Sequence, residues 1–594
     1  MVLRRGVRWF FSPALLSATA VFLAAVSPDA RIETQSGVDS PDAPKQNAPA
    51  PLPPVPTAAP PLPNLDAPHS VLGEAMLLER KGDFDAAITK YQQHLQQKPK
   101  SPDAYAGLTR CYLKKKDVAE AYNAAQKGLD VADGWPVRVA LGEVYFRQGK
   151  IPEAETEWTQ VINSGHQAAR AYMGIARVRW AIQMNKSAKT MIDKAHELDP
   201  KDEDIQRLWI ETQPYGGRIK YYESYLADSS NQDAEERGNL ERYLSYLKER
   251  AKQTRSPCRL VSKVRSTTTP LVRLFLDPKH LRGYGLSVDL NGKRTNIMLD
   301  TGASGILVKR HTAERAGITK LMASRVWGVG DRGNKGSFIG IAKSIRIGAL
   351  EFQDCPVQVM EDRSVADEDG LIGADIFEDF LVEVDFPKEQ LKLSELPKRP
   401  GQSEQQVALK DEDDDSRGAE SSDATAAGTD GSATKTVTKS SPSGPSGPQD
   451  RYIAPEMQSY TRIFRFGHDL LVPTRVGDVP GMLFVMDTGA MNNSISPAAA
   501  RQVTKVHGDS DRIIKGLNGS VKNVFSANKA VLQFGHVRQE NQDMAAFDLT
   551  RMSESEGTEI SGFLGFVALR WLDIKIDYRD ALVDFSYDAK RFSY

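Results

Sequence analysis

A three-residue motif, Asp-Thr-Gly, occurs twice in this chain of 594 residues, beginning at Asp300 and at Asp487. Both copies directly follow an unbroken apolar run. An apolar run that ends in a Gly-containing turn is typical of a buried strand that delivers its last residues to a tight loop. The glycines, Gly302 and Gly489, lack a Cβ, so another part of the chain can approach these loops closely. One such motif alone is weak evidence, because Asp and Gly are ordinary turn residues.

The sequence after the first motif is repeated, in the same order, after the second. A Gly-rich segment comes next (327–333 and 515–520), and then a strand-like run that ends at Gly348 or at Gly535. Two apolar residues and a glycine follow, ending at Gly373 and Gly565, and an alternating run completes each copy (380–386 and 571–578). Period-2 alternation with glycine turns is typical of β structure. The pattern therefore predicts a duplicated all-β unit of roughly 120 residues.

This order of motifs resembles the retropepsin-like aspartic proteases over about 271–397 and 460–594. The resemblance implies that Asp300 and Asp487 form one catalytic dyad between two lobes. It also implies that Thr301 and Thr488 lock the two motif loops together by hydrogen bonds, supported by Gly302 and Gly489. The apolar-apolar-Gly segments would lie across the loops. Two flaps would cover a bound peptide, formed by Trp327, Gly328, Val329 and Gly330 in one lobe and by Gly516, Leu517, Asn518 and Gly519 in the other.

The chemistry explains why two copies are needed. Two carboxyls about 3 Å apart cannot both ionise, so they share one proton. One carboxyl can then take a proton from water while the other donates to the peptide carbonyl. This mechanism needs no cofactor and no metal, and it predicts activity that leans towards acid pH and resists chelators. Two alternatives stay open: a non-catalytic peptide-binding scaffold, and lobes that are active only when each pairs with its twin in another chain.

Residues 1–30 are typical of an export signal or membrane anchor. Arginines 4, 5 and 8 precede an apolar stretch at 9–26, which is at the short end for spanning a bilayer. A Pro-rich tract at 31–67 reads as an extended spacer. These features predict a periplasmic or extracellular protein, with cleavage of the signal and anchoring through 9–26 both left open.

Residues 68–256 follow a helical pattern with an internal repeat. Alanines 87, 121, 154 and 188 are spaced 34, 33 and 34 apart, which resembles the tetratricopeptide repeat. Gly82 and Gly149 mark the turn of two repeats, whereas Lys116 replaces it in the second and Asn185 lies near it in the fourth. The resemblance implies a solenoid that binds a protein partner, or else a structural spacer, with 203–256 as a helical cap. Because solenoid repeats contact mainly their neighbours, we expect the solenoid to be separable from the lobes.

The remaining segments set the domain boundaries. An acidic, Ser/Gly/Pro-rich stretch at 398–459 predicts a disordered linker between lobe 1 (257–397) and lobe 2 (460–594). The three cysteines, at 111, 258 and 355, suggest no disulfide or metal framework, and a net charge of −1 gives no reason to expect nucleic acid. Motifs of rival hydrolases, such as HExxH, are absent from the sequence. The predicted fold is multidomain α+β, with an all-α solenoid before two all-β lobes.

Overall fold

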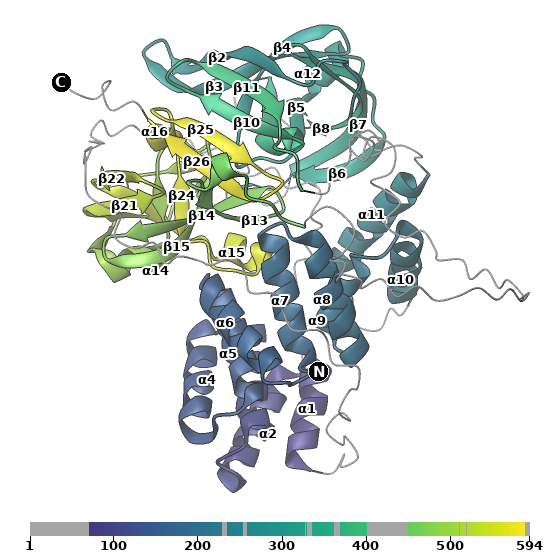
Figure 1. Ribbon diagram of the computed structural model, residues 1–594, viewed down its shortest axis with the longest axis vertical. Coiled ribbons are helices and arrows are strands. Elements are labelled where there is room, and N and C mark those ends of the chain that lie inside the picture. The colour runs from purple at the N-terminus through teal and green to yellow at the C-terminus, as the bar shows by residue number, and fades with distance from the viewer. Residues whose placement is uncertain are drawn as a thin grey trace, which may run out of the picture.

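The computed structural model places a helical solenoid next to two β-rich lobes, as the sequence predicts (Figure 1). It describes residues 70–227, 234–252, 258–326, 328–329, 335–361, 369–400, 450–509, 511–517 and 519–587. No helix in these ranges is long and apolar enough to cross a membrane. The proposed signal and the Pro-rich tract lie outside them.

The solenoid consists of antiparallel helix pairs. The four pairs are α1 (Val71–Arg80) with α2 (Phe84–Gln97), α3 (Pro102–Lys114) with α4 (Val118–Ala132), α5 (Trp135–Arg147) with α6 (Ile151–Asn163), and α7 (Ala169–Ala181) with α8 (Asn185–Leu198). The four spaced alanines lie on α2, α4, α6 and α8, and all are fully buried. Small residues at these positions allow the helices to pack closely, which is why the spacing is visible in the sequence.

The turn inside each pair has the same backbone conformation in all four repeats. Gly82, Lys116, Gly149 and Gln183 have φ values of 74°, 67°, 76° and 63°. Two of these left-handed positions are therefore occupied by residues other than glycine, which is unfavourable for a side chain. In the fourth repeat the turn residue is Gln183, and Asn185, the candidate from the sequence, instead begins α8.

The predicted cap comprises three helices, α9 (Glu203–Ile210), α10 (Tyr215–Ala227) and α11 (Ala234–Ala251). Helix α9 packs on α8, and α10 and α11 form a small core of their own around Tyr222, Leu240 and Leu247. Helix α11 also contacts lobe 1, so the cap connects the solenoid to the first lobe.

Each lobe is built almost entirely of strands. Lobe 1 contains β1 (Arg259–Leu260), β2 (Thr267–Asp277), β3 (His280–Leu290), β4 (Lys293–Asp300), β5 (Ile306–Lys309), α12 (Arg310–Arg315), β6 (Met322–Val326), β7 (Lys335–Ile347), β8 (Leu350–Met360), β9 (Gly370–Gly373), the 3₁₀ helix η2 (Ala374–Phe377), β10 (Phe380–Asp385) and β11 (Gln390–Glu395). Lobe 2 contains η3 (Pro455–Met457), β12 (Thr461–Arg462), β13 (Phe464–Phe466), β14 (Asp469–Val476), β15 (Val479–Met486), β16 (Ser494–Ile495), α14 (Pro497–Val503), β17 (Val506–Gly508), β18 (Ile514–Gly516), β19 (Gly519–Val521), β20 (Val524–Ala527), β21 (Ala530–Phe534), β22 (Val537–Asn541), β23 (Met544–Phe547), α15 (Thr550–Glu556), β24 (Gly562–Leu564), α16 (Phe566–Leu569), β25 (Asp573–Asp577) and β26 (Leu582–Ser586).

The two lobes pair with each other through a continuous sheet. Within it, the order β12-β26-β25-β10-β11-β2 runs from lobe 2 into lobe 1. The crossing point is the antiparallel pair β10–β25, with Val382 opposite Ile576 and Val384 opposite Ile574. All four side chains are buried. The lobes are thus joined within one chain by backbone hydrogen bonds and a common apolar core.

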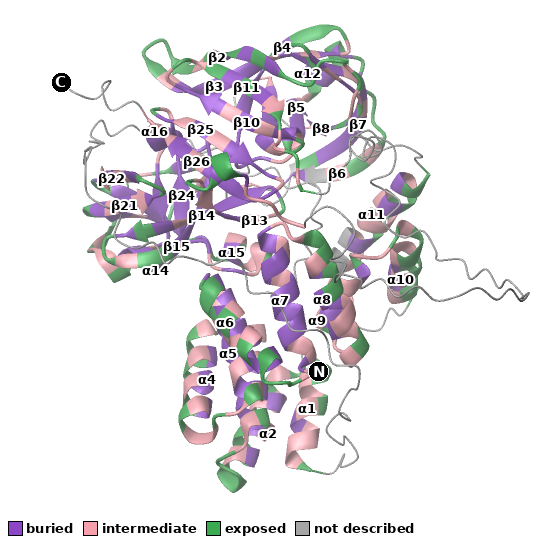
Figure 2. Cartoon of the chain, in the orientation of Figure 1, coloured by how far each residue is buried: buried purple, intermediate pink, exposed green. Residues whose placement is uncertain are grey.

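The solenoid shares a hydrophobic core with lobe 2. Buried residues of α5 to α9 belong to the same cluster as residues of β13 to β15 and β23 to β24, and Figure 2 shows buried positions on both α7 and β13. The ring of Phe146 lies 6.1 Å from that of Phe466, and the Arg177 guanidinium lies 4.0 Å from the Phe146 ring centre.

Polar contacts reinforce this interface, mainly along the segment that contains α15. Arg147 donates to the carbonyl of Ser553 at 2.6 Å, Thr558 donates to the carbonyl of Phe146 at 2.7 Å, and Lys116 pairs with Glu554 at 2.7 Å. The premise that the solenoid contacts mainly its own repeats was therefore wrong, and we now expect that the solenoid cannot be separated from lobe 2. The physical reason is that the ends of α5 and α7 leave apolar surface that the next repeat does not cover and that lobe 2 does.

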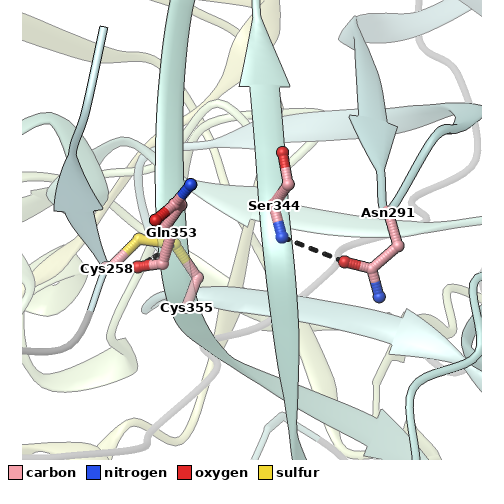
Figure 3. Close-up of a disulfide and its surroundings, with 5 residues drawn as sticks. All are labelled: Cys258, Asn291, Ser344, Gln353 and Cys355. Carbon is pink, nitrogen blue, oxygen red and sulfur yellow. Dashed lines mark hydrogen bonds between the residues drawn. A yellow bond between two sulfur atoms is a disulfide. The ribbon is translucent and has the colours of Figure 1, made fainter.

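A disulfide joins Cys258 to Cys355 (Figure 3). Cys111 is a buried free thiol. The prediction that the three cysteines form no disulfide was wrong for Cys258 and Cys355. Strand β1 pairs with β8, with Arg259 opposite Gln353, and this register brings two cysteines 97 residues apart into contact. Such a pairing depends on long-range strand order, which cysteine spacing does not reveal.

The two ends of the linker meet at one buried carboxylate. Arg399 pairs with Asp580 at 2.6 Å, and the backbone N–H of Tyr452 donates to the same carboxylate at 3.0 Å. Two residues before Tyr452, the Asp450 carboxylate accepts hydrogen bonds from two backbone N–H groups in the first turn of α8. These are the N–H groups of Lys186 and Ser187, at 3.0 and 2.8 Å. The predicted linker, 398–459, is therefore too long: 398–400 and 450–459 are part of the folded protein, and 401–449 lies outside the described residues.

Because both linker ends contact Asp580, we expect that 401–449 can be removed. Replacing it with about eight Gly and Ser residues, which reach roughly 25 Å when extended, should leave the melting temperature within about 2 °C of the full-length value. Differential scanning calorimetry would measure this. A larger loss would show that the linker itself stabilises the folded lobes.

Candidate active site

Strands β4 and β15 deliver the two Asp-Thr-Gly motifs to the boundary between the lobes. Strand β4 ends at Asp300 and runs parallel to β9, with Asp300 opposite Gly373. Strand β15 ends just before Asp487 and runs parallel to β24, with Met486 opposite Leu564. The apolar-apolar-Gly segments thus lie beside the motif loops, as the sequence predicts.

Thr301 and Thr488 hold the two motif loops together by four hydrogen bonds, which we call the threonine clasp. The backbone N–H of Thr301 donates to Thr488 Oγ1 and that of Thr488 donates to Thr301 Oγ1, both at 3.0 Å. Each hydroxyl also donates to a carbonyl across the interface: Thr301 to Met486 at 2.7 Å, and Thr488 to Leu299 at 3.0 Å. This reciprocal set fixes the separation of the two carboxyls.

Glycine at the third motif position is required by the close approach of the loops. A Cβ on Gly302 would lie 2.6 Å from Cγ of Asp487, and one on Gly489 would collide with the carboxyl of Asp300. Each carboxyl therefore lies over the glycine of the opposite loop. Any side chain at either glycine would push the two carboxyls apart.

The two carboxyls lie within hydrogen-bonding reach of each other. Backbone N–H groups hold one oxygen of each: Gly302 donates to Asp300 Oδ1 at 2.9 Å, and Gly489 and Ala490 donate to Asp487 Oδ1 at 2.8 and 2.9 Å. Among the described residues no N–H or O–H group donates to Oδ2 of either carboxyl, and both Oδ2 atoms are buried. The remaining way to give these two oxygens a hydrogen bond is one proton shared between the two carboxyls.

Burial governs the ionisation of the pair. Both Asp300 and Asp487 are 0 % exposed. Burial raises the pKa of each carboxyl above its ordinary range, and the neighbouring charge of Asp487 raises the pKa of Asp300 further. Backbone N–H donors oppose this rise at both residues. The pair consequently retains a proton at pH values at which an exposed Asp has lost its own.

The two flap hairpins touch each other. The first is the hairpin of β6 and β7 and the second that of β18 and β19, where Gly516 lies opposite Gly519. Of the predicted flap residues, Gly328, Val329, Gly516, Leu517 and Gly519 lie at these hairpin ends; Trp327, Gly330 and Asn518 lie outside the described residues. A Cβ on Gly328 would lie 2.8 Å from Cβ of Leu517, so the flap tips are in contact.

Sequence reasoning missed Asp375, which supports the first motif loop. Its carboxylate accepts from the Ser304 hydroxyl at 3.0 Å and from the Gly305 N–H at 2.9 Å. The sequence does contain a signal for this role: Asp375 is an acidic residue in an otherwise apolar run, two positions after Gly373. In lobe 2 the second motif loop is held by a different residue: the side chain of Asn493 accepts a hydrogen bond from the Gly565 N–H at 2.8 Å. The two loops therefore differ at the position after Asp-Thr-Gly-Ala, where lobe 1 has Ser304 and lobe 2 has Met491.

A second missed group lies where lobe 2 meets the solenoid. His468, in the β13–β14 turn, is buried, and burial lowers its pKa while Asp375, Glu556 and Asp300 act to raise it. Burial and the charge of Asp469 raise the pKa of Glu556 to about 8. Nothing in the local sequence marks these residues, because their proximity depends on the shared core.

Comparison with known protein families separates the two parts of the chain. Residues 286–376 match the aspartyl protease family, and residues 78–136 match the tetratricopeptide repeat family. The first match covers the region around Asp300, and the second covers the first helix pairs of the solenoid.

Similar proteins are known for each part. DNA damage-inducible protein 1 from Chaetomium globosum is 31 % identical over 108 residues, which are 18 % of this chain and 23 % of the relative. The same protein from Neurospora crassa is 29 % identical over 116 residues, 19 % of this chain and 26 % of the relative. This chain therefore spans only about a quarter of the length of these relatives.

Two solved structures are also similar. A retropepsin-like aspartic protease from Rickettsia conorii shares 20 % identity, with a TM-score of 0.17 and coverage of 23 % of this chain and 93 % of that one. A tetratricopeptide protein from Thermus thermophilus shares 17 % identity, with a TM-score of 0.24 and coverage of 30 % and 97 %. From its motifs, its paired lobes and these family matches, the chain contains a retropepsin-like aspartyl protease region preceded by tetratricopeptide repeats.

Proposed function

We propose that this protein is an aspartic-type endopeptidase that hydrolyses peptide bonds with a water activated by Asp300 and Asp487. The observation that supports this best is the geometry of the dyad: two fully buried carboxyls in hydrogen-bonding reach, held by the reciprocal threonine clasp. In the proposed reaction, the ionised member of the pair takes a proton from the attacking water. The protonated member donates to the carbonyl oxygen of the substrate.

The flaps suggest how a substrate is held. An extended peptide between the flaps and the dyad would form strand-type hydrogen bonds with the flap backbone. Both catalytic loops belong to rigid strands joined by the clasp, so the carboxyls are positioned before the peptide arrives. Such preorganisation is what positioned acid–base catalysis requires.

We propose further that the protein is exported and works in the periplasm or outside the cell. The basic and apolar pattern of residues 1–30 supports this, with cleavage or retention of the segment as an anchor both compatible with it. The Cys258–Cys355 disulfide gives independent support, because disulfides persist mainly in oxidising compartments. The solenoid would bind a substrate or partner protein through α1 and α2, which lie at the end of the solenoid away from lobe 2 (Figure 1).

The pH profile of cleavage provides the test of this proposal. Only the singly protonated pair is active, so the rate should follow a bell-shaped curve. Because burial raises the pKa of both carboxyls, the pair loses its first proton above the ordinary Asp value of about 4. The acid limb should therefore lie above about pH 4, and the optimum should be closer to neutral than for a solvent-exposed dyad. Cleavage of a denatured protein mixture from pH 3 to 9 would measure this.

Inhibitors discriminate between this mechanism and metal-dependent hydrolysis. A peptide with a hydroxyl group that mimics the tetrahedral intermediate should inhibit cleavage, whereas EDTA should not change the rate. Activity that EDTA abolishes and zinc restores would contradict the proposed function.

A further inference from the structure

One segment of lobe 2, residues 553–559, lies against α5 and α7 of the solenoid. It contains the end of α15 and the residues that follow it (Figure 1). Three hydrogen bonds attach it to the solenoid: Arg147 to the Ser553 carbonyl at 2.6 Å, Arg177 to the Gly557 carbonyl at 3.4 Å, and Thr558 to the Phe146 carbonyl at 2.7 Å. The turn after α5 touches the same segment, because a Cβ on Gly149 would lie 3.1 Å from the Glu559 carbonyl oxygen.

The donors of these hydrogen bonds are removed from water. Thr558 is fully buried, and burial lowers the pKa of Arg177 to about 10. A buried donor or acceptor that loses its partner costs more free energy than the bond itself contributes. Each donor therefore restrains the backbone that it contacts, and the solenoid fixes the position of 553–559.

The restrained segment leads directly into β24. Only three residues lie between Thr558 and this strand. The Ile560 N–H donates to the Ser553 hydroxyl at 2.9 Å, and the Ser561 N–H donates to the Leu483 carbonyl of β15 at 2.7 Å. So short and well-bonded a connection leaves little slack, and a displacement at Thr558 is passed on to β24.

Strand β24 and the residues after it hold the loop of Asp487. Three backbone hydrogen bonds join the two: the N–H of Asp487 to the Leu564 carbonyl at 3.0 Å, that of Phe566 to the Ala490 carbonyl at 2.7 Å, and that of Val567 to the Met491 carbonyl at 2.9 Å. The backbones are also in close contact, because a Cβ on Gly565 would lie 2.4 Å from the Asn492 carbonyl oxygen. The position of Asp487 therefore depends on that of 564–567.

The corresponding residue of lobe 1 is attached to its own lobe. Asp369 directly precedes β9, as Ser561 precedes β24. The Asp369 carboxylate accepts from the Thr295 hydroxyl at 2.6 Å and lies 3.0 Å from Nε2 of His311. The strand beside Asp300 is thus anchored at this point within lobe 1, whereas the strand beside Asp487 is anchored through the solenoid.

We infer that Thr558, Arg147 and Arg177 are positioning residues, through which the solenoid sets the place of Asp487 relative to Asp300. This inference rests on the proposed function, and it gives the solenoid a role in that same site. A displacement of about 1 Å at a reacting group can lower the rate by about 10²-fold, so a small shift of β24 is enough. The three residues do not belong to the flaps, so their loss should lower kcat and leave KM unchanged.

The substitution Thr558→Val tests this role, because it keeps the shape of the side chain and removes the donor to the Phe146 carbonyl. We expect kcat to fall at least about tenfold, with KM within about twofold of the wild-type value. Thr558→Ser keeps the hydroxyl and should retain at least about half of the wild-type kcat. The bell-shaped pH profile of Thr558→Val should also become narrower, because two carboxyls that lie farther apart interact less. A change in stability alone would not narrow it.

The matched control is Thr109→Val. Thr109 is also a fully buried threonine of this protein, and it donates to the Tyr105 carbonyl at 2.8 Å within α3. Its substitution removes the same kind of hydrogen bond and should leave kcat, KM and the pH profile unchanged. If Thr558→Val does not fold, Arg147→Met is the second variant, because Arg147 is half-buried and methionine retains its aliphatic packing. It should lower kcat in the same way.

Hydrogen exchange of residues 562–567 tests the positioning separately from catalysis. Thr558→Val should increase exchange in this segment at least about tenfold, because the opening of β24 becomes easier, and Thr109→Val should not. Faster exchange in Thr558→Val, with no cleavage by wild type, would support the positioning contacts and contradict the proposed function. Unchanged exchange, an unchanged kcat in Thr558→Val, or an equal loss of kcat in Thr109→Val would overturn the inference.

Discussion

Changing either Asp300 or Asp487 to asparagine should reduce peptide cleavage by about 10²- to 10⁴-fold. The remaining carboxyl can act as acid or as base, but not as both in one turnover. The double variant should be little worse than either single variant, because residues that act as a unit are strongly non-additive. Steady-state kinetics on the same peptide substrate would measure all three.

The pattern across the variants also tests the pairing of the lobes. The structure joins the lobes within one chain through β10 and β25, and the threonine clasp crosses the same interface. If lobes instead paired with their twins in another chain, each single variant would retain one intact site. Substantial turnover by Asp300→Asn at concentrations where the protein is monomeric would contradict the intrachain dyad. Asp478→Asn, at an exposed turn, is the matched control and should keep full activity.

Melting temperatures at two pH values would show whether a variant has lost activity because it unfolds. The folded protein raises the pKa of both carboxyls, so it favours their protonated form. Wild type therefore loses stability as pH rises from the ordinary Asp value through the raised value, and the double asparagine variant, which has neither carboxyl, does not. The melting temperature of the double variant should match that of wild type near pH 4 and exceed it near pH 8. Lower melting temperatures at both pH values would show that the substitutions disturb the fold.

The dyad and its clasp could be predicted from the sequence because their determinants are local and repeated. Asp, Thr and Gly are adjacent in each motif, and the resemblance carried by the repeated order of motifs implied that Asp300 and Asp487 meet, while pairing of each lobe with its twin in another chain stayed open. The alanine spacing predicted the four helix pairs for the same reason. The repeat also predicted the turn positions of the first three repeats, but it pointed to Asn185 and not to Gln183 in the fourth, and it could not show that Lys116 and Gln183 would adopt a conformation that favours glycine.

The features that the sequence did not predict depend on contacts between distant segments. The register of β1 and β8 brings Cys258 to Cys355, and neither local sequence specifies that register. Asp580 holds both ends of the linker, and Asp450 caps a helix of the solenoid. Each of these residues looks like an ordinary loop aspartate in the sequence, and only the fold gives it a partner.

Deleting the solenoid and its cap, residues 70–252, should prevent lobe 2 from folding stably. The deletion removes Phe146 from the ring of Phe466, and it leaves the carbonyls of Ser553 and Gly557 without their arginine donors. Burying a large apolar side chain stabilises a protein by about 1.5–3 kcal/mol, and several are uncovered together. The total is comparable with the 5–15 kcal/mol that typically separates folded from unfolded states.

We therefore expect the lobes alone to be insoluble, or to melt well below the full-length protein without a cooperative transition. The protein lacking 401–449 provides the matched control, because it loses a segment outside the shared core and should fold normally. A milder test uses single residues: Phe146→Ala should lower stability by about 3–5 kcal/mol. Phe275→Ala, at a side chain 52 % exposed, should change it little. In calorimetry, solenoid and lobe 2 should unfold in one transition, since a common core couples them. Soluble lobes with wild-type peptide cleavage would show that the solenoid is an independent module after all.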